Sequence, residues 1–402
     1  MQTMLGRLDE LAGIESDAGV VAWLERVAFV FLILMVISAP HSIAATQTAW
    51  ITGMFVWIIR LFFQPRVKFR FGLLDAALWG FFLWSVITSL TSYAPDISVN
   101  KLRGAAVFLI FYFVLYNLRT RRAIHTVAFT LIVSCMVNVL WTPVQRLIGR
   151  GVEIHGLAPN SPLAKAILGE GDALLEANGR KLYAPDDVVV AIEQQEVTKL
   201  KFYRPDFEYV VEIKRADLLD GSTALEKLGI SSWKKSRNWR SSGFYGHYTT
   251  YSEVLQLIAS LVLGLLVASV RRNRDKRQET RDRRREHSSA SRLPSPFLPL
   301  SLSHLLLLFS LLMMSLALLL TVTRASQLAF LIAGAVIVLV GLGRKWLVGA
   351  IAVAVPLAGI GLFFLQQSRQ VGFFDPTDDS TRWRQTVWRE GVDLWTDSPR
   401  HF

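Results

Sequence analysis

The sequence predicts a polytopic α-helical membrane protein with a small α+β domain inserted between two of its spans. Of the 402 residues, 52% are hydrophobic and only 19% are charged, whereas a soluble domain carries about 25% charged residues. Mean hydropathy is +0.35. Long apolar runs fill most of the chain, and a polar stretch interrupts them after residue 150. These observations disfavour a soluble enzyme and indicate a protein built around membrane-spanning helices.

The apolar runs are long enough to cross a bilayer, because a helix needs about 20 apolar residues to span a hydrocarbon core of ~30 Å. The first run follows a charged leader, residues 1–25, and ends without a small-residue cleavage site, so it is not a cleaved signal peptide. Cys135 is the single cysteine and lies inside the fifth run, which excludes disulfides and cysteine-rich metal sites. The nine predicted spans are 26–44, 47–63, 73–93, 104–118, 123–147, 251–270, 297–322, 325–342 and 346–365.

Lysine and arginine are distributed unequally between the predicted loops. With the N-terminus inside, the inner loops hold eighteen of them and the short outer connections hold only Lys101, Arg103 and Arg324. The positive-inside rule therefore predicts a cytoplasmic N-terminus. The inner loop 271–292 has ten basic residues and no aromatic residue. A nucleic-acid surface is one interpretation, but attachment to a span at each end favours a solvated loop facing anionic membrane lipids, with no nucleic-acid partner.

Between the spans of 26–150 and those of 251–365, residues 151–218 have the pattern of a small α+β domain. The predicted order is strand, short helix, strand, helix, strand, strand, followed by a linker over 219–250. Ser161-Pro162 opens the short helix, and Asn178-Gly179 forms a turn. With Ser161 to Ala166 and Gly171 to Gly179 at this spacing, about 65 residues resemble a bacterial PDZ domain, although the usual leading strand is missing. By the topology above, the domain is periplasmic.

The PDZ resemblance implies a peptide groove between the 152–157 strand and the 186–194 helix. A peptide or protein C-terminus would add there as a further strand, with the carboxylate-binding loop near 148–151. The other interpretation is a folded spacer that binds nothing. The groove residues that the resemblance implies are Gly151, Val152, Ile154, Val188 and Ile192.

A periplasmic PDZ domain between spans is also a feature of intramembrane metalloproteases, which makes a protease an alternative interpretation. Their chemistry needs two histidines and a glutamate in the pattern HExxH. None of the seven histidines begins that pattern, and the serine-hydrolase pattern GxSxG is also absent. The protease interpretation is therefore excluded by the residues present.

Three patches at the predicted outer face carry polar and aromatic residues. They are the stretch from Arg240 to Tyr251, the stretch from Leu320 to Ser326, and the stretch from Asp378 to Pro399, in the predicted outer loop 366–402. Each has an ordinary interpretation, as an interfacial arginine, a hairpin cap or an aromatic belt. Arg324, however, lies between two long apolar runs, where an ionisable residue is costly and marks a site by default. Arg240 and Arg324 face one compartment, and guanidinium groups match phosphate oxygens.

These patches resemble the O-antigen ligase and O-antigen polymerase family of membrane glycosyltransferases. The matching pieces are Arg240 with Gly243-Phe244 and His247 before a span, Thr321 to Ala325 between spans, and the outer stretch Ser380 to Pro399. The resemblance implies transfer of a glycan from an undecaprenyl-pyrophosphate carrier to lipid A-core or another saccharide acceptor. The reaction would take place at the outer face of the bacterial inner membrane, without a metal or cofactor. Ligase and polymerase remain alternatives.

Carried over to this chain, the resemblance gives Arg240, Arg324 and Arg382 as contacts of the donor pyrophosphate. Tyr245, His247 and Tyr248 would contact sugar. The family's catalytic histidine follows a glycine-rich turn further along, so we expect it and two or three more spans beyond residue 402, and no catalytic residue is assigned. A competing hypothesis is a non-catalytic scaffold or sensor that displays the PDZ-like module. A transporter is disfavoured because no internal repeat is visible.

Overall fold

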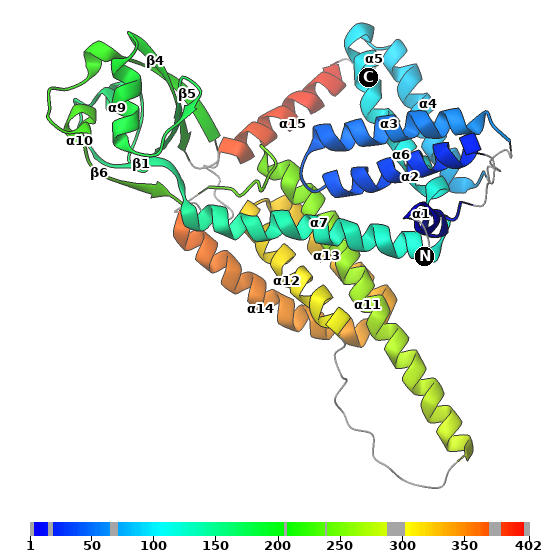
Figure 1. Ribbon diagram of the computed structural model, residues 1–402. Helices are drawn as coiled ribbons and strands as arrows, with labels where there is room; N and C mark the ends of the chain where they lie inside the picture. The colour runs from blue at the N-terminus through cyan, green and yellow to red at the C-terminus, as the bar shows by residue number, and fades with distance from the viewer. Residues whose placement is uncertain are drawn as a thin grey trace. The chain divides into compact units, whose positions relative to one another are not determined.

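The computed structural model describes residues 4–14, 19–64, 71–204, 207–237, 239–287, 302–369 and 379–397 (Figure 1). It divides into two compact units. One contains Met1–Ser134 and Val371–Phe402, and the other contains Cys135–Gln370. Helix α7 (Arg121–Ile148) contributes to both.

The first unit is helical and centres on a hairpin of α2 and α3. Its core consists of apolar side chains such as Phe29, Leu32 and Phe113, which are at most 1% exposed. Gly53 on α3 lies directly against Phe31 and Phe113, so the absence of a side chain there permits close helix packing. Its elements are α1 (Met4–Ala12), α2 (Gly19–Ser38), α3 (Ile43–Leu61), α4 (Leu73–Leu90), α5 (Pro95–Ala105), η1 (Ala106–Phe108), α6 (Leu109–Asn117), the first part of α7, and α15 (Asp379–Asp397).

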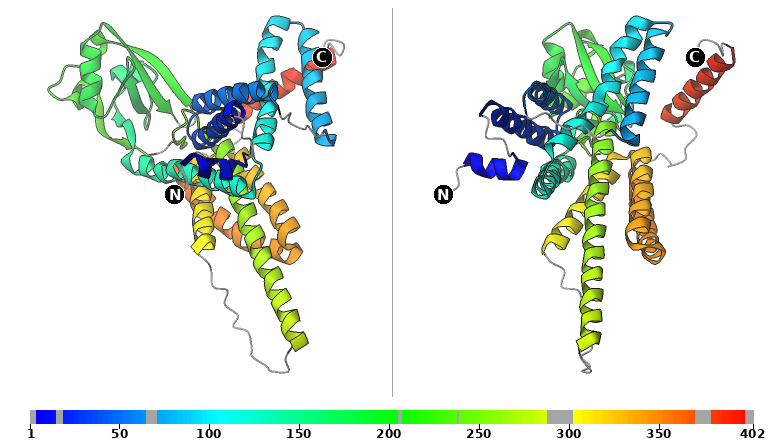
Figure 2. Two further views of the ribbon diagram at one scale, coloured as in Figure 1. Left: turned by 45° about the vertical axis from the view of Figure 1, so that its right-hand side comes forward. Right: turned by 90° about the vertical axis from the view of Figure 1, so that its right-hand side faces the viewer.

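Helices of the second unit pack around α11 (Tyr248–His287), which contacts α12 (Leu302–Thr321) and α13 (Arg324–Leu342). A further helix, α14 (Arg344–Arg369), contacts α13. Helix α11 extends well past α12 and α13 (Figure 2). The basic segment predicted as a loop over 271–292 is therefore helical as far as His287, and its remaining residues lie outside the described part of the chain.

Among the described residues, seven helices are long and apolar enough to cross a membrane. The predicted span 47–63 is present as helix α3, but α3 is not among these seven helices. The predicted span 346–365 falls within α14, and the side chains of only part of α14 are described. The composition and these helices are those of a polytopic membrane protein. The seven are Gly19–Ser38, Leu73–Leu90, Pro95–Asn117, Arg121–Ile148, Tyr248–Asp275, Leu302–Thr321 and Arg324–Leu342.

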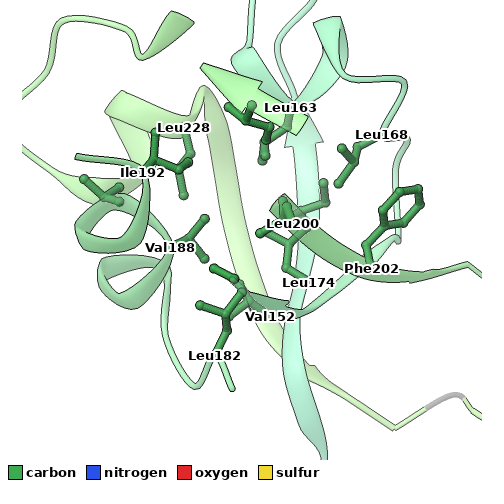
Figure 3. Close-up of a cluster of buried hydrophobic side chains, with 14 of the residues drawn as sticks. Val152, Leu163, Leu168, Leu174, Leu182, Val188, Ile192, Leu200, Phe202 and Leu228 are labelled. Atoms are coloured by element: carbon green, nitrogen blue, oxygen red, sulfur yellow. The ribbon is translucent and has the colours of Figure 1, made fainter. Parts of the chain in front are cut away.

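The inserted domain, defined here as Arg150 to Ser236, contains an antiparallel sheet in the order β5-β4-β2-β1-β6, with β3 beside β2. Helix α9 packs on β2 and β4, and α10 packs on α9 and β6. One apolar core fills the space between them (Figure 3). The elements are β1 (Arg150–Leu157), α8 (Pro162–Lys165), β2 (Ala173–Ala177), β3 (Arg180–Lys181), α9 (Pro185–Glu193), β4 (Val197–Arg204), β5 (Phe207–Lys214), η2 (Arg215–Asp217), α10 (Ala224–Leu228) and β6 (Ile230–Ser236).

The last strand of the domain corrects the predicted peptide groove. Strand β6 comes from the stretch expected as a linker, and it pairs with β1 along the edge that the prediction left for a peptide. Because β2 covers the other edge, β1 is paired on both sides. The side chains of Val152, Ile154, Val188 and Ile192 are 0% exposed and form the core. Gly151 adjoins the Leu174 carbonyl so closely that any side chain would collide with it. The four apolar residues therefore form no open groove between β1 and α9.

Candidate functional site

The stretch from Arg237 to His247, called here the Arg240 segment, runs from the inserted domain to α11. Gly243 in this segment has φ +55°, and a side chain at this position would collide with the amide oxygen of Asn138 on α7. The next residue uses that oxygen, because the Phe244 N–H donates to Asn138 Oδ1 at 3.0 Å. The Phe244 ring stacks on Trp141, with centroids 6.2 Å apart. Glycine is therefore required for the segment to lie against α7.

The Arg240 segment is also joined to the turn between α12 and α13. The Ser241 N–H donates to the Leu320 carbonyl at 3.0 Å. One helical turn into each helix, the hydroxyls of Ser252 on α11 and Ser326 on α13 lie 3.0 Å apart and are buried. The structure thus brings together the chain segments that carry Arg240 and Arg324, which lie far apart in the sequence.

The turn before Arg324 is strained and well ordered by hydrogen bonds. Val322 has φ +52°, which is unfavourable for a β-branched residue. Thr321 is fully buried, and its hydroxyl donates to the Leu318 carbonyl at 2.7 Å. Arg324 is the first residue of α13 and is partly exposed. The dipole at the N-terminal end of this 19-residue helix adds to the positive potential of the Arg324 guanidinium.

Arg240 lies in a cavity with two of the predicted sugar contacts. Its guanidinium is 4.6 Å from the centroid of the Tyr248 ring, and the His247 ring stacks on Tyr248 at 4.9 Å. These three residues line a cavity of about 300 Å³, called here the Arg240 cavity. The inserted domain supplies its other wall, which consists of Arg150, Tyr203, Phe207 and Glu208.

Tyr245, the third predicted sugar contact, is only 7% exposed. Its ring packs against Tyr251, at 6.3 Å between centroids, and burial raises the pKa of Tyr245 to about 12. The Tyr251 hydroxyl in turn lies 2.8 Å from the hydroxyl of Thr142 on α7. The Tyr245 side chain therefore points away from the Arg240 cavity and packs against the helices beneath the segment's backbone.

Arg382 lies on α15, in the first unit, where it is exposed. Helix α15 forms most of the outer stretch predicted from Asp378 to Pro399, and its aromatic side chains are also exposed. Trp388, for example, retains 75% of its accessible surface. A helix with exposed tryptophans and arginines is typical of a segment that lies at a membrane surface or receives a partner.

Sequence reasoning missed the wall that the inserted domain contributes. Arg150 was expected only as part of a carboxylate-binding loop, and Tyr203 and Glu208 carried no expectation. The signal available in the sequence was an arginine between two glycines, Gly149-Arg150-Gly151. In the structure both glycines have positive φ, +78° and +60°. Glycines on both sides of an arginine allow tight local packing of the backbone.

Comparison with known families identifies one region of the chain. Residues 309–400 match the family model described as O-antigen ligase. The matched region includes Arg324 and Arg382, and it excludes Arg240 and the inserted domain. Comparison with curated proteins and with solved structures gave no match. The family match supports the resemblance inferred from the outer patches and indicates a role in polysaccharide assembly at a membrane.

Proposed function

We propose that the protein is a membrane glycosyltransferase of the O-antigen ligase type. It would transfer a glycan from undecaprenyl pyrophosphate to lipid A-core or another saccharide acceptor, on the periplasmic face of the bacterial inner membrane. The observation that carries the proposal is the hydrogen bond from Ser241 to Leu320. This bond holds the Arg240 segment against the turn before Arg324, which lies inside the region 309–400 matched to O-antigen ligase.

The proposed step is a substitution at the anomeric carbon of the donor. The acceptor hydroxyl oxygen forms the new glycosidic bond, the bond between that carbon and the pyrophosphate oxygen breaks, and the proton of the hydroxyl goes to a base. Negative charge accumulates on the departing pyrophosphate. Arg240 and Arg324 would neutralise this charge through charge-assisted hydrogen bonds that strengthen as the bond breaks. His247 and Tyr248 would present ring faces and polar groups to the sugar. We assign no general base among the described residues.

The proposal is tested in cells that lack their own O-antigen ligase, by following glycan attachment to lipid A-core on gels. We expect Arg240→Ala and Arg324→Ala each to lower transfer by about a hundredfold, since each removes a charge-assisted contact that acts in the transition state. The lysine variants should retain part of the activity, because an ammonium keeps the charge but loses the bidentate geometry. Arg180→Ala, at an exposed position of β3, is the matched control.

Native levels of transfer by both alanine variants, at equal amounts of protein in the membrane, would contradict the proposal. That result would favour the alternative of a non-catalytic scaffold or sensor, in which the inserted domain carries the function. A scaffold would lose its function through surface changes in the inserted domain and not through changes in the Arg240 segment.

A further inference from the structure

A larger cavity adjoins the Arg240 cavity and shares Arg150, Glu208 and Ser242 with it. Its volume is about 620 Å³. One wall comes from the end of α7, with Trp141 and Gln145, and the rest comes mainly from the inserted domain. We call it the Arg150 cavity. The remaining lining residues include Lys181, Tyr183, Lys201, Lys235 and Trp239.

The Arg150 cavity lies against the sheet face opposite α9. Side chains alternate between the two faces of a strand. Leu200 and Phe202 of β4 belong to the domain core beneath α9, whereas Tyr203 belongs to a separate buried cluster with Ala173, Leu175 and Trp239. The cavity therefore lies on the other side of the sheet from the α9 face predicted to hold a peptide, although it is lined by residues 148–151, the loop predicted to bind the peptide carboxylate.

The guanidinium of Arg150 is held between two aromatic rings. It lies 4.7 Å from the Tyr203 centroid and 5.0 Å from the Trp239 centroid, and both rings are 6% exposed. Gly149 and Gly151 fix the backbone on either side, since side chains there would collide with Lys235 and with the Leu174 carbonyl. Aromatic faces stabilise a cation in this geometry. The arginine is consequently positioned before any ligand binds.

The hydrogen-bonding capacity of Arg150 is largely unused within the described residues. Its Nε is buried and finds no hydrogen-bond partner among them. Its Nη1 lies 3.4 Å from Glu208 Oε1, while the other oxygen of Glu208 is held by Lys201 at 2.6 Å. Burial lowers the pKa of Arg150, and Glu208 and Tyr203 offset part of this effect. Buried donors of this kind normally have partners, and here a ligand would supply them.

The surroundings of Arg150 match a ligand that combines negative charge with a ring. The cavity contains four cationic side chains, those of Arg150, Lys181, Lys201 and Lys235, against the carboxylates of Glu176 and Glu208. Arginine in this setting suits phosphate oxygens. Trp141, Tyr183 and Trp239 add aromatic surface, and a few polar groups among aromatic walls are typical of small-ligand sites.

We propose that the Arg150 cavity binds a phosphorylated saccharide, with the phosphate on Arg150 and the sugar between the aromatic side chains. The inserted domain would then be a glycan-binding module that extends the Arg240 site. This inference rests on the proposed function for the origin of the glycan. The phosphate would be at the anomeric carbon if the ligand is the donor, or on another hydroxyl if the ligand is a phosphorylated acceptor sugar.

Binding to the whole chain in detergent tests the proposal without requiring transfer. Calorimetric titrations use glucose 1-phosphate, glucose 6-phosphate, glucose and inorganic phosphate. We expect one sugar phosphate to bind about tenfold more tightly than glucose or phosphate alone. Arg150→Gln should weaken its binding about tenfold, the effect of losing one hydrogen bond to a charged group. Preference for the 1-phosphate supports donor binding, and preference for the 6-phosphate supports acceptor binding.

Two matched controls lie on the same strands as the lining residues. Arg180→Gln neighbours Lys181, and Lys199→Gln lies two positions from Lys201 on the same face of β4, but neither Arg180 nor Lys199 lines the cavity. Both control variants should bind within about twofold of the native affinity. Lys201→Gln and Trp239→Phe should both weaken sugar-phosphate binding. These two variants test the proposal if thermal melting shows that Arg150→Gln is misfolded.

Absence of sugar-phosphate binding, equal binding of inorganic phosphate, or native binding by Arg150→Gln together with Trp239→Phe would overturn the proposal. Its failure is separable from failure of the proposed function. If Arg240→Ala loses glycan transfer and the native protein binds no sugar phosphate, the transferase proposal is supported and the proposal of a glycan-binding module is rejected. If sugar-phosphate binding depends on Arg150 but Arg240→Ala and Arg324→Ala keep native transfer, the glycan-binding module is supported and the transferase proposal is rejected.

Discussion

Gly243 shows how one residue positions the Arg240 segment. Its φ of +55° belongs to the left-handed region, where an L-residue with a side chain costs about 1–2 kcal/mol. A side chain would also displace Asn138, which is fully buried and accepts the Phe244 N–H. Both effects act on the same short turn, three residues after Arg240.

Gly243→Ala should therefore reduce both stability and glycan transfer. We expect a loss of about 2–3 kcal/mol in the free energy of unfolding, from the backbone term together with the broken hydrogen bond to Asn138. Thermal unfolding in detergent and the cellular transfer assay measure the two effects. Gly246→Ala is the control for stability, because no atom lies within 4 Å of the position of its added side chain. Equal melting temperatures for the two variants would contradict this account.

The sequence grouped some residues of the candidate site correctly in space and missed others for a physical reason. Arg240, His247 and Tyr248 lie within nine residues of one another, so their proximity follows from local sequence, and they line one cavity. Tyr245 belongs to the same stretch, but a turn of the backbone directs it inward. Arg150 meets Tyr203 and Trp239 only through the pairing of distant strands, which no local pattern reveals.

The helices and strands of the inserted domain were predictable from the sequence wherever apolar and polar residues alternate regularly. The strand and helix order predicted from Val152 to Lys214 agrees with the structure except for the two-residue strand β3, which was not predicted. Strand β6 was missed because its sequence contains two serines and two lysines that face solvent or the cavity, so the alternation is weak. That omission left the edge of β1 open in the prediction and produced the incorrect groove. Similarly, the basic run at the end of α11 contains good helix formers and continues the helix instead of forming a loop.

A buried ion cluster connects three elements of the first unit. Glu25 on α2 accepts hydrogen bonds from Arg60 on α3, at 2.8 Å, and from Arg119 before α7, at 3.0 Å. The side chains of Glu25 and Arg60 are only 5% and 4% exposed. Burying either charge without the other is costly, so the pair fixes the beginning of α2 beside the end of α3.

Glu25→Leu should destabilise the helical hairpin, because Arg60 would remain buried without its carboxylate. The expected loss is about 3–5 kcal/mol in the free energy of unfolding, and the double variant with Arg60→Leu should recover part of it. Thermal unfolding of the purified protein provides the measurement. Glu10→Gln serves as the control, since its ion pair with Arg122 is exposed and should contribute less than about 1 kcal/mol. Similar losses in both single variants would argue against a special role for the buried pair.

For the whole chain, one feature explains how a soluble domain interrupts a series of spans. The inserted domain begins and ends at neighbouring points, because Arg150 at the start of β1 pairs with Ser236 at the end of β6. Arg146 at the end of α7 also donates a hydrogen bond to the Arg237 carbonyl at 3.1 Å. Neighbouring entry and exit points allow insertion without separating the helices on either side. The same arrangement keeps the Arg150 cavity next to the Arg240 segment.

The predicted topology places the inserted domain and the basic end of α11 on opposite sides of the membrane, and the single cysteine makes this testable. Cys135 is 1% exposed, so it should give little background labelling. Cysteines introduced at Lys199, exposed on β4, and at Arg274, exposed on α11, report the two sides. A membrane-impermeant maleimide applied to intact spheroplasts should label Lys199→Cys at once and Arg274→Cys only after permeabilisation, because basic residues remain cytoplasmic. The native chain, whose single cysteine is Cys135, is the control. Labelling of Arg274→Cys in intact spheroplasts would reverse the topology and remove the Arg240 site from the compartment in which a periplasmic glycan transfer must occur.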